Sequence, residues 1–88
     1  MRRYRIPTRV TLPWGYVVPV LQVSDDEMRE QNGGHLADGL WDCTQRRIYI
    51  RMSLSASRKR YILTHEIGHA FLDWQHHHLN NGWAAASR

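Results

Sequence analysis

The feature that most restricts this chain is the pentapeptide His65-Glu66-Ile67-Gly68-His69. Two histidines four residues apart lie on one face of an α-helix, about 6 Å apart along its axis. Imidazoles placed in this way can converge on one ion at Zn–N distances of about 2.0–2.1 Å. The pattern H-E-x-x-H therefore predicts a helix that carries a zinc site, with Glu66 beside the metal as a general base.

The residues around the motif have the spacing of an amphipathic helix. Apolar side chains recur at intervals of three and four, which predicts a helix from about Ala56 to about Asp73, N-capped by Ser55. Gly68 costs such a helix about 1 kcal/mol relative to Ala, which is easier to explain if a strand or a substrate passes close to the metal. The predicted apolar face consists of Ile62, Leu63, Ile67, Ala70, Phe71 and Trp74.

The segments before this helix have patterns of strands and turns. Residues 16–23 are rich in β-branched side chains and predict a strand, in which Pro19 indicates an edge position or a bulge. Residues 24–30 predict a short helix that Gly33 and Gly34 end. Together these patterns indicate that the chain forms a sheet before the zinc-binding helix begins.

A hairpin completes the predicted fold. Residues 36–41 and 47–52 flank a polar turn, and the second arm alternates apolar and polar side chains. We therefore expect one α+β domain over residues 1–88, with a small antiparallel sheet packed against one zinc-binding helix, as in a minimal zincin. Its expected parts are an extended arm or short strand (1–14), a sheet region (16–52), the active-site helix (55–74) and a C-terminal tail (75–88).

Composition excludes several other classes of protein. The chain has 88 residues, of which 42% are hydrophobic, and its longest apolar run falls well short of the ~20 residues that span a bilayer. No apolar stretch of a secretory signal follows the basic N-terminus, and Cys43 stands alone, so we expect a cytoplasmic protein with no membrane partner. The net charge of +4 comes without a nucleic-acid-binding motif, so we interpret it as a solvated surface.

The sequence does not identify the third zinc ligand. A catalytic zinc usually has three protein ligands and a water. On a continuous helix Asp73 and His76 would lie about 12 Å and about 16 Å from His65 along the axis, too far to share an ion. We therefore expect the helix to end shortly after Phe71 so that the chain folds back. The favoured third ligand is His76, followed by His77 and His78, with Asp73 last.

The wider sequence resembles a known family. The segments that carry the resemblance are Gly39-Leu40-Trp41-Asp42, Arg47-Ile48-Tyr49-Ile50, Ser53-Leu54-Ser55 and residues 58–70. Over about residues 36–74 the chain resembles the ImmA/IrrE-like zinc metallopeptidases, which are small bacterial, phage and mobile-element proteins. The resemblance implies a gluzincin-like α+β fold, with His65 and His69 as ligands and Glu66 as the catalytic base. Members of the family usually take the third ligand from a Glu on a later helix, and no Glu follows Glu66 here.

The expected function is zinc-dependent hydrolysis of peptide bonds. The resemblance implies endoproteolysis of a regulatory protein, often a helix-turn-helix repressor. An extended protein or peptide substrate would add to a sheet edge, and Glu66 would take a proton from the attacking water and deliver it to the leaving amine. Two alternatives are a non-catalytic, zinc-stabilised interaction module and a basic nucleic-acid-binding protein, the latter supported by charge alone.

Overall fold

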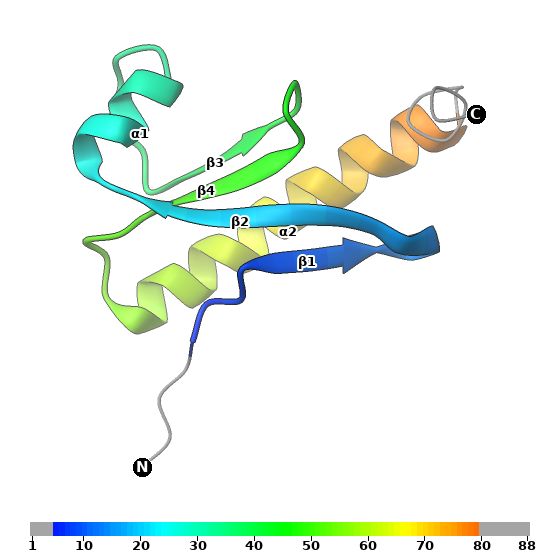
Figure 1. Ribbon diagram of the computed structural model, residues 1–88, viewed down its shortest axis with the longest axis horizontal. Coiled ribbons are helices and arrows are strands. Elements are labelled where there is room, and N and C mark those ends of the chain that lie inside the picture. The colour runs from blue at the N-terminus through cyan, green and yellow to red at the C-terminus, as the bar shows by residue number, and fades with distance from the viewer. Residues whose placement is uncertain (1–4, 80–88) are drawn as a thin grey trace.

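The computed structural model describes residues 5–79, which form a four-stranded sheet and two α-helices (Figure 1). A 3₁₀ turn over Pro13–Gly15 joins the first two strands. The predicted α+β class is confirmed. The strands are β1 (Arg9–Leu12), β2 (Tyr16–Val23), β3 (Gly39–Asp42) and β4 (Arg47–Arg51), and the helices are α1 (Asp25–Gln31) and α2 (Ala56–Leu79).

The sheet is mixed, which corrects the expectation of a wholly antiparallel one. Its strand order is β1-β2-β4-β3. The pairs β1–β2 and β3–β4 are antiparallel, so the predicted hairpin of β3 and β4 is confirmed, but β2 and β4 run parallel. The chain leaves β2 through α1 and forms β3 before it returns beside β2. A crossover of this kind allows neighbouring strands to point the same way.

Pro19 lies in β2, which is an inner strand of the sheet, so the expected edge position was wrong. The first half of β2 pairs with β1, where Arg9 is opposite Pro19, and the second half pairs with β4, beginning at Val20. The Val20 N–H donates to the Thr8 carbonyl over 2.8 Å. Because successive residues of a strand direct their N–H groups to opposite sides, the Pro19 nitrogen faces the β4 side just before that ladder begins. The missing N–H therefore removes no hydrogen bond from the sheet.

The two helices pack on opposite faces of the sheet (Figure 1). In β4, Ile48 and Ile50 point towards α2 and Tyr49 points towards α1, as the alternation of a strand requires. The predicted apolar face of α2 is confirmed, although Phe71 lies at its margin with 38% of its surface exposed. The core beneath α2 consists of Leu12, Val18, Val20, Ile48, Ile50, Leu63, Ala70 and Trp74, and the smaller core beneath α1 of Val23, Met28 and Tyr49.

Local hydrogen bonds explain where the helices begin. The Ser24 hydroxyl accepts from the Glu27 N–H over 3.2 Å at the start of α1, and the Ser55 hydroxyl accepts from the Arg58 N–H over 3.3 Å at the start of α2. Ser55 as the predicted N-cap of α2 is therefore confirmed. The end of α1 is followed by Gly34, whose φ of 89° lies in the left-handed region that favours glycine.

Candidate metal centre

His65 and His69 come together on the solvent side of α2. Their Nε2 atoms are 3.1 Å apart, and their rings lie 4.6 Å apart at an angle of 56°. Two nitrogens that each lie about 2.0–2.1 Å from a tetrahedral zinc ion would be about 3.3 Å apart. Both side chains are exposed, so an ion can reach them from solvent. The donor pair fits zinc in atom type and in spacing.

Glu66 lies inward from the two histidines. Only 8% of its surface is exposed, whereas its neighbour His65 is exposed. Burial raises the pKa of the Glu66 carboxyl above its ordinary value of 4.5, and the nearby His69 and His65 act in the opposite direction. A partly desolvated carboxylate one residue from a candidate metal ligand is chemically suited to accept and return a proton.

Gly39 of β3 brings the sheet against this carboxylate. A Cβ at residue 39 would lie 2.3 Å from Cγ2 of Ile62 and 3.2 Å from both Cγ and Oε2 of Glu66. Only a residue without a side chain fits between β3 and α2 at this level. By contrast, a Cβ at Gly68 would meet nothing within 4 Å, so no strand explains Gly68, and the strand that passes close to the motif does so at Gly39. Periodicity could not reveal this, because a strand of four residues offers too few positions.

β3 is an edge strand of the sheet, and its Gly39 lies next to Glu66. The Arg51 N–H donates to the Asp38 carbonyl over 3.0 Å, which fixes the phase of the antiparallel ladder. Since hydrogen-bonded pairs alternate with non-bonded pairs, Gly39 directs its N–H and C=O groups to the outer edge. A main-chain donor and a main-chain acceptor of the residue that lies against Glu66 therefore face this edge.

The helix does not end after Phe71, and this overturns the expected position of His76. α2 continues to Leu79, so His76 lies about 16 Å from His65 and about 10 Å from His69 along the axis. No Gly or Pro interrupts residues 72–79, and Trp74 extends the buried face by a further turn. The burial of Trp74 keeps this part of the chain helical. His76 therefore does not complete the site of its own chain.

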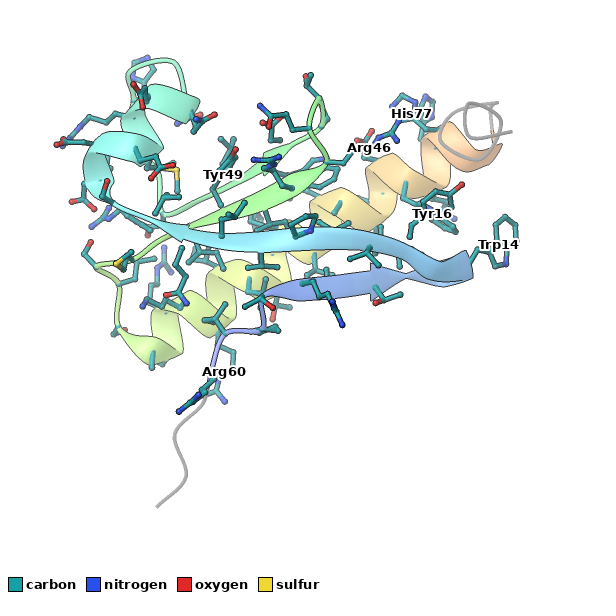
Figure 2. The ribbon with its side chains drawn as sticks, in the orientation of Figure 1. Trp14, Tyr16, Arg46, Tyr49, Arg60 and His77 are labelled. Atoms are coloured by element: carbon teal, nitrogen blue, oxygen red, sulfur yellow. The ribbon has the colours of Figure 1, made fainter. Side chains whose placement is uncertain are left out.

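Two of the alternative third ligands, Asp73 and His77, are not at the site either. Asp73 accepts a hydrogen bond from the Trp41 indole N–H over 3.1 Å and contacts His77 Nε2 over 2.9 Å. Figure 2 shows His77 towards the C-terminal end of α2, far from Arg60 in its first turns. The side chain of His78 lies outside the described residues. Among the side chains of residues 5–77 no group of three or more potential ligands gathers, and residues 80–88 contain no His, Cys, Asp or Glu.

Comparisons of the chain with protein-family models, with curated proteins and with solved structures gave no match. The resemblance to the ImmA/IrrE-like peptidases thus stays a prediction from the quoted segments. In the part of the chain that the structure describes, neither helix combines the length and apolar character needed to cross a membrane.

Proposed function

We propose that this chain is a zinc-dependent endopeptidase of the ImmA/IrrE-like kind. The observation that carries the proposal is the 3.1 Å approach of His65 Nε2 to His69 Nε2, with Glu66 buried beside them against β3. Two imidazoles at the spacing for one zinc ion and an adjacent carboxylate are the core of a metal-assisted hydrolytic site.

The three side chains have separate roles in this proposal. His65 and His69 hold the metal through their Nε2 atoms. Zinc, when bound, supplies the Lewis acidity that polarises a scissile carbonyl and activates a water. Glu66 accepts the proton of the attacking water on its carboxylate and passes it to the leaving amine. In the chain without metal, the raised pKa of Glu66 makes its carboxylate a stronger proton acceptor, which favours the first of these steps.

The outer edge of β3 is the proposed binding surface for substrate. An extended peptide that pairs with the main chain of Gly39 would run beside Glu66, because Gly39 lies directly against that side chain. Main-chain pairing gives affinity with little sequence selectivity. We propose a regulatory protein such as a repressor as the substrate and the cytoplasm as the location, supported by the family resemblance and by the single Cys43.

A second candidate function is a non-catalytic, zinc-stabilised interaction module. It is favoured by one observation, namely that no third ligand joins His65 and His69 among the described residues. In such a module a partner's ligands would close the remaining positions of the metal, and Glu66 would have no proton to transfer.

The test combines metal analysis with cleavage of an extended peptide library by the full chain. Glu66→Gln should bind as much zinc as the wild type and lose at least ~100-fold in cleavage rate, because the general base is gone. Gln75→Ala, an exposed change on the same helix, is the matched control and should cleave normally. Equal cleavage by the Gln variant would remove the proposed mechanism. Zinc binding without cleavage by the wild type would favour the interaction module.

A further inference from the structure

One exposed stripe of α2 contains more metal-binding side chains than its own site uses. At about 100° per residue, His69, Leu72 and His76 lie about 40°, −20° and 20° around the helix from His65. Tyr61 and Gly68 border the same stripe. The core residues Leu63, Ala70 and Trp74 lie on the opposite side, about 140–180° away. We define the histidine stripe as Tyr61, His65, Gly68, His69, Leu72 and His76.

The histidine stripe is open to solvent and contains exposed apolar surface. Leu72 is 66% exposed and Tyr61 is 62% exposed, while His65, His69 and His76 are all exposed. A Cβ at Gly68 would meet nothing within 4 Å, so another helix could approach closely there. None of the six residues has a fixed charge, and two identical copies of the stripe would therefore meet without like-charge repulsion.

The spacing along the stripe matches a twofold axis. His65 and His69 are centred on position 67, which is nine residues before His76. If two copies of α2 pack antiparallel about an axis midway between residues 71 and 72, His76 of each copy falls level with position 67 of the other. Each site would then lie about 7 Å along the helix from the axis, with Leu72 of both copies between the sites. A closed dimer of this symmetry forms two equivalent sites.

We propose that two copies of this chain pair antiparallel through α2, and that His76 of each copy supplies the third ligand to the zinc held by His65 and His69 of the other. The inference rests on the proposed function only in taking zinc as the metal of the site. It explains how a chain with two ligands at its site can form a three-histidine centre that retains one position for water or substrate. The occupant of the stripe is a second copy, and zinc links the two.

The first test measures metal content and molecular mass of the full chain with added zinc. We expect a dimer with one zinc per chain, which a chelator returns to monomers. His76→Ala should weaken zinc binding by at least ~10–100-fold, the loss that even an outer-shell partner produces, and should abolish the dimer. His77→Ala is the matched control and should keep both. His77 contacts Asp73 and the edge of the His76 ring, at 5.3 Å between ring centres, but lies about 100° around the helix from His76. A wild-type chain that binds zinc tightly as a monomer would overturn the inference.

Mixing two defective variants gives a sharper test. His76→Ala keeps the pair of ligands, and the double variant His65→Ala/His69→Ala keeps only the third ligand. Mixed together, they should form a dimer with one restored zinc site for every two chains, whereas each variant alone should show no tight site. No gain on mixing would overturn ligation by the second copy. Glu66→Gln should retain zinc and the dimer although it loses cleavage. A wild-type dimer that binds zinc but cleaves no peptide would contradict the proposed function and leave this inference standing.

Discussion

Gly39 and Glu66 are in direct apposition across the boundary between the sheet and α2. A Cβ at residue 39 would stand 3.2 Å from Oε2 of Glu66, and the carboxylate is buried as a result of this proximity. The same contact sets β3 beside the turn of α2 that holds the proposed base and the first of the two candidate zinc ligands, His65. One glycine therefore determines both the environment of the proposed base and the position of the sheet edge next to it.

The first prediction concerns this glycine. Gly39→Ala should destabilise the protein by about 1–3 kcal/mol, because the new methyl group would overlap Ile62 and crowd Glu66. Urea unfolding measures the change. Gly68→Ala is the matched control: it adds a methyl group into open space within a helix and should stabilise the zinc-free protein by up to about 1 kcal/mol. Equal stability of the two alanine variants would show that the β3–α2 contact is not tight.

The second prediction follows from the raised pKa of Glu66. Between its ordinary value of 4.5 and its value in the folded, metal-free protein, the folded state retains a proton that the unfolded chain has released. The stability of the zinc-free protein should therefore fall as pH rises through this interval. Glu66→Gln removes the titration. The free energy of unfolding of this variant should therefore exceed that of the wild type by more above the interval than below it. Urea unfolding from about pH 4 to about pH 8 measures this difference.

The groups that face Glu66 act against this effect. Protonated His69 and His65 lower the pKa of the carboxyl, and burial outweighs them in the folded chain. His69→Ala should therefore raise the pKa of Glu66 further and steepen the decline in stability with pH. A parallel pH dependence in wild type and Glu66→Gln would mean that another group carries the titration.

The local features of the fold were predictable from the sequence, whereas its non-local pairings were not. Ser55 as a cap, the apolar face of α2 and the β3–β4 hairpin each depend on residues a few positions apart. The parallel pairing of β2 with β4 depends on residues about 28 positions apart, such as Val20 and Ile48, and no local pattern encodes it. The position of Pro19 could not be predicted for the same reason. Its missing N–H costs no hydrogen bond because the ladder with β1 ends and the ladder with β4 begins at this point of β2.

The candidate site was predictable to the same extent. His65, Glu66 and His69 lie within one helical turn, so helix geometry alone brings the imidazoles together. The expected position of His76 was wrong because a site completed within one chain requires the helix to end shortly after Phe71. The burial of Trp74 extends α2 instead. Gly39 was missed as a site residue, because its role depends on a contact with a helix that follows much later in the sequence.

The third prediction concerns the ion-pair network that joins β3 and β4 to α2. Asp38, just before β3, accepts from Arg51 Nη1 over 3.0 Å and from Arg58 Nε and Nη2 over 3.1 and 3.0 Å. Asp38→Ala should cost about 1–2 kcal/mol, since these charge-assisted bonds are partly shielded from water. Arg29→Ala breaks an exposed pair with Asp26 and should cost less than about 1 kcal/mol. Thermal unfolding measures the loss of stability in both variants. An equal loss in Asp38→Ala and Arg29→Ala would argue against the network.

The fourth prediction concerns zinc and stability. An ion that binds only the folded chain stabilises it by about 2.7 kcal/mol when its free concentration is 100 times the dissociation constant. Thermal unfolding of the wild type should therefore shift upward with zinc and return on chelation, and His65→Ala should abolish the shift. The gain should shrink as pH falls, because imidazole must lose its proton to bind a metal. His35→Ala is the control, since His35 lies in the loop before β3 and should leave the shift unchanged. An unaltered shift in His65→Ala would mean that zinc stabilises the fold from another position.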